Sequence, residues 1–181
     1  LSIVFIVFTI VWIFMLGFGS PVVLLAGFIF GKWLGTLLAV FSMTTGAILL
    51  YIFANYFFKN LIKEKFLSRF KNFETKFRNN EFTFFLIYRF VGGIPFPLAN
   101  LLPVLFNIKL KNYFFGSFIG LTPQVFLIAS LGSGIEQIIK NSNTVPSIFE
   151  LLLSPEIYLP ISGFILLVLI TFILKKFFYK K

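Results

Sequence analysis

Long apolar stretches alternate along the chain with short charged segments. Residues 1–18 are uncharged, and residues 33–58 form a run of 26 residues without a charge, which is long enough to span a bilayer with some tilt. Residues 112–135 and 157–174 are two further apolar runs. A transmembrane β-barrel would instead show short segments of alternating hydrophobicity. The pattern predicts an all-α polytopic membrane protein.

Residues 84–108 form an apolar stretch that is interrupted in its middle. It carries one charge, Arg89, and four residues that break helices: Gly92, Gly93, Pro95 and Pro97. A spanning helix needs about 20 unbroken apolar residues, and each arm here supplies roughly half of that. Pro97 would lose a helical hydrogen bond, and the residue before each proline is restricted away from α geometry. We predict a re-entrant hairpin and, because its backbone and charge need protein or water around them, a candidate site.

An ungapped shift of 74 residues relates the two halves of the chain. The identical pairs that it aligns include Gly19 with Gly93, Pro21 with Pro95, Leu24 with Leu98, Phe41 with Phe115 and Gly46 with Gly120. Each half then holds a broken hairpin followed by a spanning helix. We expect the first hairpin to open outward and the second inward, which makes the fold an inverted repeat of a re-entrant hairpin plus a transmembrane helix. Met15 aligns with Arg89, so the site is expected to be asymmetric.

Residues 59–78 change character. Apolar side chains recur at spacings of three and four with charges between them: Ile62, Phe66, Phe70, Phe73 and Phe77. This pattern predicts an amphipathic helix in the membrane interface. Seven basic residues against two acidic ones would attract anionic headgroups, at about 1 kcal/mol per basic residue, so the segment is expected to face the cytoplasm. A solvated charged linker is the alternative.

Composition supports a membrane protein. Of the 181 residues 59% are hydrophobic and 12% are charged, with a mean hydropathy of +0.98, which excludes a soluble globular domain and a disordered one. The net charge of +10 gathers at membrane edges and does not indicate nucleic-acid binding. Cysteine and histidine are absent, which removes disulfides, imidazole metal sites and histidine-based catalysis. We expect no enzyme activity, no cofactor and no metal, and we identify no cleavable signal peptide.

The chain is expected to form one membrane domain, residues 1–181. Its expected parts follow the charge pattern: the first helix, outward-opening re-entrant hairpin and spanning helix (1–58), the cytoplasmic amphipathic helix (59–80), the inward-opening re-entrant hairpin and spanning helix (81–135), a polar external loop (136–156), and the last spanning helix with its basic tail (157–181). Small residues within the spanning runs let helices pack closely. Helix packing is expected at Gly46, Gly120 and Gly132, and Pro123 is expected to kink its helix.

Arg89 is the strongest candidate for a binding residue. An arginine near the bilayer centre costs roughly 2.5–3.5 kcal/mol on insertion scales, so such residues face a cavity or a partner. No Asp or Glu lies within an apolar run, which favours an anionic ligand, and the guanidinium fork matches phosphate oxygens. The alternative is a snorkelling or structural arginine, bonded to carbonyls that the prolines free. Asn100 and Gln124 are placed to line the same cavity or, equally, to join helices.

Residues 89–132 resemble a known family. The resemblance rests on an arginine, a Pro-Phe pair six residues later, an asparagine, an F-x-x-x-x-x-G-x-x-P pattern and a final glycine: Arg89, Pro95, Phe96, Asn100, Phe114, Gly120, Pro123 and Gly132. On these residues the chain is similar to VTT-domain membrane proteins of the DedA superfamily, in the branch grouped with SNARE-associated Golgi proteins. The resemblance implies two opposed re-entrant loops, and movement or equilibration of phospholipids or polyprenyl-phosphate carriers across the bilayer.

The chain departs from the family pattern in several places. The family often has proline where Gly92 stands, and glycine near Pro103 and Asn107. The acidic residues that DedA relatives carry beside the first re-entrant loop have no counterpart near Pro21. Proton-dependent transport is therefore the family property that we carry over least readily.

These features predict an integral membrane protein that moves or equilibrates phospholipid or polyprenyl-phosphate lipids between leaflets, as a scramblase or transporter, with phosphate held by Arg89. A solute or ion transporter of the same fold and a structural membrane protein are the alternatives. The expected partners are membrane lipids, with anionic headgroups at residues 59–78, and no nucleic acid; a homo-oligomer is left open. The expected location is the bacterial inner (plasma) membrane, with residues 59–78 and the C-terminus in the cytoplasm.

Overall fold

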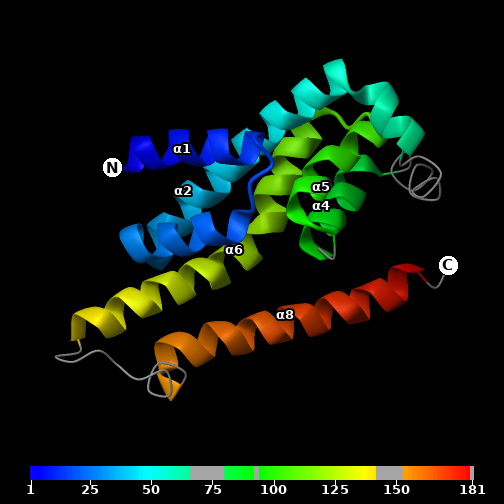
Figure 1. Cartoon of the computed structure of the whole chain (residues 1–181). Coiled ribbons are helices and arrows are strands. Elements are labelled where there is room, and N and C mark those ends of the chain that lie inside the picture. Colours follow the sequence, from blue (N-terminus) through cyan, green and yellow to red (C-terminus); the bar gives the residue numbers. More distant parts are fainter. Residues whose placement is uncertain (66–79, 92–93, 142–152, 180–181) are drawn as a thin grey trace.

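The computed structural model describes residues 1–65, 80–91, 94–141 and 153–179, and these form helices and short connections (Figure 1). The elements are α1 (Ser2–Phe14), α2 (Gly19–Phe57), α4 (Glu81–Val91), α5 (Phe96–Leu101), the 3-10 helix η1 (Leu102–Phe106), α6 (Leu110–Asn141) and α8 (Pro155–Tyr179). Within the described part of the chain, α2 and α6 are long and apolar enough to cross a membrane. The predicted all-α class is therefore confirmed for the described residues.

The first helical hairpin consists of α1 and the first arm of α2, residues 19–30. The chain reverses over residues 15–18, where the indole of Trp12 donates a hydrogen bond to the carbonyl of Phe18 at 2.9 Å. The rings of Phe5 and Phe30 meet edge to face with their centroids 5.4 Å apart, which places the two arms side by side and antiparallel. The reversal therefore joins two short helices, as the sequence predicted.

The predicted break at Gly19 and Pro21 lies a few residues too late in the chain. Both residues belong to the first turn of α2, directly after the reversal. The N–H groups of a first helical turn have no acceptor within the helix, so a proline there costs no hydrogen bond. Pro21 therefore starts a helix and does not interrupt one.

Gly31 divides α2 into two arms. Its φ of 77° and ψ of 169° lie in a region that is accessible almost only to glycine. The second arm, residues 32–57, folds back on the first, since a Cβ at Gly35 would lie 2.5 Å from the carbonyl oxygen of Ala26. The second arm agrees closely with the predicted apolar run of residues 33–58.

The second helical hairpin consists of α4 on one side and α5 with η1 on the other. The hydroxyl of Tyr88 donates to the carbonyl of Ala99 at 3.0 Å, which places the arms antiparallel. Pro95 is the N-cap of α5 and Pro97 lies in its first turn, so Pro97 removes no helical hydrogen bond, contrary to our expectation. Gly92 and Gly93, which we also predicted in this break, lie outside the described residues.

α6 is the central helix and packs against α2, α4 and α8 (Figure 1). It is continuous through Pro123, and the predicted kink stays a prediction. The predicted external loop at residues 136–156 is wrong at both ends, because α6 continues to Asn141 and α8 begins at Pro155. An ion pair between Lys140 and Glu136, one turn apart, supports the additional helical turn.

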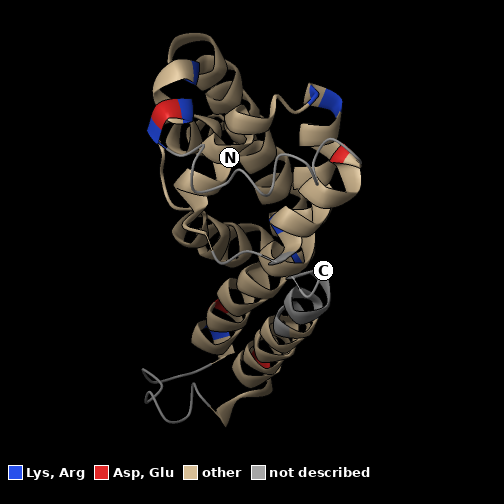
Figure 2. Ribbon diagram, turned by 90° about the vertical axis from the view of Figure 1, so that its right-hand side faces the viewer, with Lys and Arg blue, Asp and Glu red and all other residues tan. Residues whose placement is uncertain are grey.

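The long helices expose apolar side chains to the surroundings. On the second arm of α2 alone, large apolar groups more than 40% exposed include Trp33, Leu37, Phe41, Leu49 and Tyr56. Figure 2 shows that charged positions are few and lie mainly toward the upper and lower ends of the ribbon. Contiguous apolar surface of this kind marks contact with lipid or with another protein.

The predicted amphipathic helix is described only over residues 59–65, which are helical. Within this segment Ile62 is buried against the bundle, whereas Leu61 is 61% exposed. The remainder of the prediction, residues 66–79, lies outside the described residues.

Candidate functional site

Arg89 lies near the inner end of the second hairpin, and its side chain is only 3% exposed. It follows Glu81 by eight residues on α4, a rise of about 12 Å along the helix axis. The fold thus buries a permanent positive charge deep in an apolar bundle.

Two neutral side chains hold the guanidinium of Arg89. Its Nη1 donates to Oδ1 of Asn100 and its Nη2 to the hydroxyl of Tyr113, both at 2.7 Å. The hydroxyl of Tyr113 donates onward to the backbone carbonyl of Asn100 at 3.1 Å. The Cζ atom of Arg89 lies 5.1 Å from the ring centroids of Phe85 and Tyr113, a geometry that adds cation–π attraction. Among the described residues no carboxylate pairs with Arg89, so its charge is not neutralised.

Arg89 and Asn100 also keep unused donors. The Nε of Arg89 and the Nδ2 amide of Asn100 are buried and have no hydrogen-bond partner in the described part of the chain. A buried donor without a partner costs about 1–3 kcal/mol, and such groups in native proteins are explained by water, an ion or a ligand. These two N–H groups are therefore the unsatisfied hydrogen-bond donors next to the guanidinium.

A cavity of about 180 Å³ lies between the breaks of the two hairpins. Its lining comes from both hairpins and from α6, and includes Gly19, Ser20, Arg89, Ile94, Phe96 and Gln124. A Cβ at Gly19 would lie 3.8 Å from the ring of Phe96, so the starts of α2 and α5 face each other. The first turn of α2, with its N–H groups and the positive end of the helix dipole, thus borders the same cavity as Arg89.

Gln124 ties α6 to the inner end of α4. Its Nε2 donates to the carbonyl of Phe90 at 2.8 Å and to that of Arg89 at 3.3 Å. These carbonyls lie in the last turn of α4, where no helical donor remains for them. Gln124 therefore both lines the cavity and holds the backbone that carries Arg89.

Polar contacts join the two arms of the second hairpin at its open end, where α4 begins and η1 has ended. Oε1 of Glu81 accepts from the backbone N–H of Lys109 at 2.6 Å and from Nδ2 of Asn112 at 2.9 Å. The Nζ of Lys59 donates to Oδ1 of Asn107 at 2.8 Å. This end of the hairpin is thus polar and basic, whereas the end that carries Arg89 is buried.

The predicted packing glycines lie at helix crossings. A Cβ at Gly46 would lie 2.9 Å from the Cβ of Ile13 on α1, and a Cβ at Gly120 would lie 2.7 Å from the Cβ of Arg89 on α4. A Cβ at Gly132 would collide with the carbonyl of Leu24 in the first arm of α2. Each glycine allows a close approach of backbones that a side chain would prevent.

Gly46 packs on Ile10 and Ile13 of α1, whereas Gly120 packs on Arg89 of α4. Ile13 is fully buried against Gly46, whereas Met15, which the ungapped shift paired with Arg89, is 74% exposed. The spacing from Ile13 to Gly46 is two residues longer than the spacing from Arg89 to Gly120. An ungapped alignment does not represent that difference. The expected asymmetry of the site stays a prediction.

The structure brings together some of the predicted site residues and adds one. Arg89 and Gln124 line one cavity. Asn100 does not line it but accepts a hydrogen bond from Arg89. Among the described residues, the guanidinium bonds to the side chains of Asn100 and Tyr113 and to no backbone carbonyl. The carbonyls of Gly92 and Gly93 lie outside the described residues, so the alternative of a structural arginine stays a prediction. Tyr113, fully buried, was not predicted, although a tyrosine within an apolar run needs a partner for its hydroxyl and this requirement marks it.

This apolar helical bundle, with two helices long enough to cross a membrane and a buried arginine in its second hairpin, fits an integral membrane protein. A model of the VTT domain matches residues 5–134, and the chain belongs to this family. The predicted resemblance is thereby confirmed. α8 lies beyond the matched residues.

Similar proteins come from distant organisms. The proteins named Transmembrane protein 41 homolog of Caenorhabditis elegans and Dictyostelium discoideum are 25% and 28% identical over 136 and 138 residues, which cover 71% and 72% of this chain and 55% and 41% of theirs. The uncharacterized protein YqeD of Bacillus subtilis (strain 168) is 28% identical over 111 residues, 60% of this chain and 53% of that protein. The chain thus spans about half the length of the curated relatives that it matches. No solved structure matches it significantly.

Proposed function

We propose that this protein moves or equilibrates phospholipids or polyprenyl phosphates between the two leaflets, and that Arg89 holds the phosphate. The observation that carries the proposal is the cavity between the hairpin breaks, because Arg89 lines it and has no carboxylate partner among the described residues. A guanidinium is matched in geometry and charge to phosphate oxygens. The first turn of α2 on the opposite wall adds a positive helix end.

The size of the cavity supports transport of a headgroup and not of a whole lipid. About 180 Å³ corresponds to roughly six water molecules, enough for a phosphate with part of its hydration. In the proposed mechanism the acyl or prenyl chains stay in the bilayer while the headgroup passes the cavity. Arg89, Asn100 and Gln124 lower the cost of bringing the phosphate charge to the bilayer centre.

We further propose that the two helical hairpins are the re-entrant loops of an inverted repeat. The equivalent contacts of Ile13 with Gly46 and of Arg89 with Gly120 support a common origin of the two halves. Transporters built in this way place their substrate at the midplane, between the broken elements. The basic open end of the second hairpin, residues 59–78 and the C-terminus would then face the cytoplasm of a bacterial inner membrane.

The test is lipid exchange between leaflets of liposomes that contain the purified protein. Labelled phospholipid and, separately, labelled polyprenyl phosphate should equilibrate with wild-type protein, and Arg89→Ala should abolish this. Arg89→Lys should retain part of the activity, because it keeps the charge but not the fork. Lys140→Gln, which removes an exposed charge on α6 at the far end from the cavity, is the matched control and should leave the rate unchanged.

Other outcomes would redirect the proposal. Passage of small solutes or ions without lipid exchange would identify a solute or ion transporter of the same fold. Neither kind of passage would favour a structural membrane protein. Wild-type rates in Arg89→Ala would remove Arg89 from the site.

A further inference from the structure

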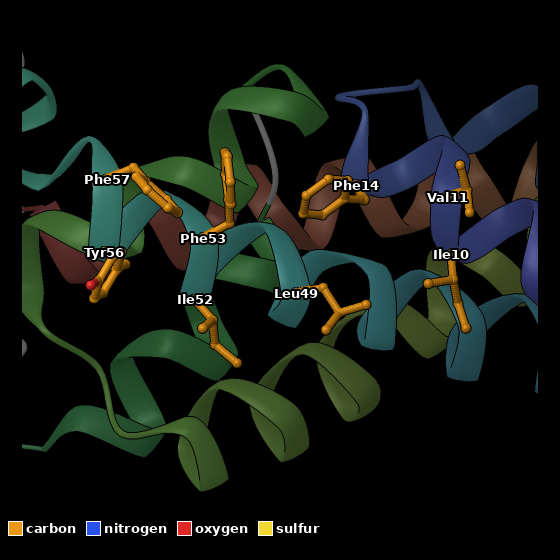
Figure 3. Close-up of a pocket in the computed structure, with 8 residues that line it drawn as sticks. All are labelled: Ile10, Val11, Phe14, Leu49, Ile52, Phe53, Tyr56 and Phe57. Atoms are coloured by element: carbon orange, nitrogen blue, oxygen red, sulfur yellow. The ribbon is translucent and has the colours of Figure 1, made fainter.

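Two apolar hollows lie on the outer face where α1 meets the second arm of α2, and the second hollow is also lined by residues 58–65 and by Leu101 of α5. The first, of about 480 Å³, is lined by Ile10, Val11 and Phe14 of α1 and by α2 residues from Leu49 to Phe57 (Figure 3). In Figure 3 the labelled side chains are hydrocarbon except for the hydroxyl of Tyr56, which marks one end of the hollow. The first hollow is therefore an apolar groove with a polar end.

The second hollow, of about 350 Å³, adjoins the first and shares Phe14 and Phe53 with it. The rings of these two residues meet edge to face with centroids 5.5 Å apart, so the pair forms the ridge between the hollows. The second hollow extends from Lys65 to Leu16, which lies in the reversal of the first hairpin. Gly19 and Ser20, just beyond that reversal, line the Arg89 cavity.

The length and charge of these hollows fit one class of ligand. From Leu49 to Phe57 the first hollow runs about 12 Å along α2, close to the half-thickness of about 15 Å that one acyl chain occupies. The polar end leads toward the helical segment 59–65, where Lys59, Lys63 and Lys65 outnumber Glu64. A lipid with two apolar chains and an anionic headgroup would place one chain on each side of the Phe14–Phe53 ridge.

We propose that the face between α1 and α2 is a docking site for one diacyl phospholipid, with a chain in each hollow and its headgroup over residues 59–65. The inference rests on the proposed function for its role, since it assigns the place where a lipid waits before its headgroup enters the cavity beside Arg89. Attraction between lysines and an anionic headgroup supplies selectivity, because apolar chains gain little by leaving one hydrocarbon environment for another.

The experiment measures phospholipid retained by the purified protein. Wild-type protein is reconstituted in vesicles of phosphatidylglycerol and phosphatidylcholine, extracted into detergent and examined by native mass spectrometry. Leu49→Trp fills the first hollow and Leu61→Trp the second, and each should lose the retained phospholipid. Leu37→Trp, on the same helix but outside both hollows and 60% exposed, is the matched control and should retain it.

Two additional variants protect the test against misfolding and examine the headgroup. Leu49→Ala enlarges the first hollow without adding bulk, so it should keep the bound phospholipid. Lys65→Gln should reduce the preference for phosphatidylglycerol by about fivefold, the effect of one basic residue near the surface.

The contradicting results are specific. Wild-type retention by both Leu49→Trp and Leu61→Trp would overturn the inference, as would a lipid-free dimer that Leu49→Trp dissociates, since a second copy would then occupy this face. The proposed function is judged separately on the same samples. Lipid exchange together with unaltered retention in the tryptophan variants would support the proposed function and overturn the docking site. Retention that the tryptophan variants lose, without lipid exchange by the wild-type protein, would support the docking site and overturn the proposed function.

Discussion

Arg89 packs directly on Gly120, and a Cβ at Gly120 would lie 2.7 Å from the Cβ of Arg89. Since both atoms lie close to their backbones, neither can move away cheaply, and Gly120→Ala should displace α4 relative to α6. Overpacking of this kind costs about 1–3 kcal/mol. We expect reduced thermal stability in detergent and a larger loss of lipid exchange. Gly163→Ala is the control, because its Cβ would meet only the side chain of Leu127; equal effects of the two substitutions would contradict the assignment.

Tyr113 should matter through its hydroxyl more than through its ring. Tyr113→Phe keeps the ring against Arg89 but removes both the acceptor for Nη2 and the donor to the carbonyl of Asn100. Hydrogen bonds to charged groups contribute about 1.5–3 kcal/mol, so we expect a loss of stability in that range, together with slower lipid exchange. Tyr158→Phe, on an exposed position of α8, should change neither. A double-mutant cycle of Tyr113→Phe with Arg89→Ala should show strong coupling, and additive effects would argue against the contact.

Substitution of Gly31 by a residue with a side chain should destabilise the protein because of the backbone conformation alone. A Cβ there would meet no atom within 4 Å, yet φ is 77° and ψ is 169°. Such a conformation costs a residue with a side chain about 1–3 kcal/mol. Gly31→Ala should therefore lower the temperature of thermal unfolding, while Gly31→D-Ala, introduced by semisynthesis, should restore it. No effect of the L-substitution would show that the turn is formed differently.

The proposed topology predicts opposite accessibility of two positions. The chain has no cysteine, so single cysteines at Asn141 and at Lys71 can be labelled without background. An impermeant thiol reagent added to intact cells should label Asn141→Cys and should reach Lys71→Cys only after the membrane is opened. The reverse pattern would overturn both the orientation and the inverted repeat.

The sequence predicted the helix-break-helix units well because their causes are local. Uncharged runs of sufficient length form helices in an apolar bundle, and the reversals fall close to the Gly-x-Pro segments. The errors were also local: a proline that precedes or opens a helix and a proline that breaks one have the same sequence signature. Pro21 and Pro97 were therefore placed in the breaks, although they lie in first helical turns.

The partners of Arg89 could only partly be predicted. The sequence predicted Asn100 as a residue that lines the same cavity or joins helices, and not as a hydrogen-bond partner of Arg89. Tyr113 lies on the next helix, and its approach depends on how α6 crosses α4 at Gly116 and Gly120.

The sequence by itself determined that the chain is an apolar helical protein with two interrupted segments, an arginine in one of them, and the motif of its family. These properties follow from hydropathy, helix-breaking residues and short spacings, which act over a few turns of chain. Only the tertiary structure decided that the two breaks meet at one cavity, that neutral side chains hold Arg89, and that two apolar hollows lie on the face where α1 meets α2. Those features depend on helix crossings, where glycines far apart in sequence set how closely backbones approach.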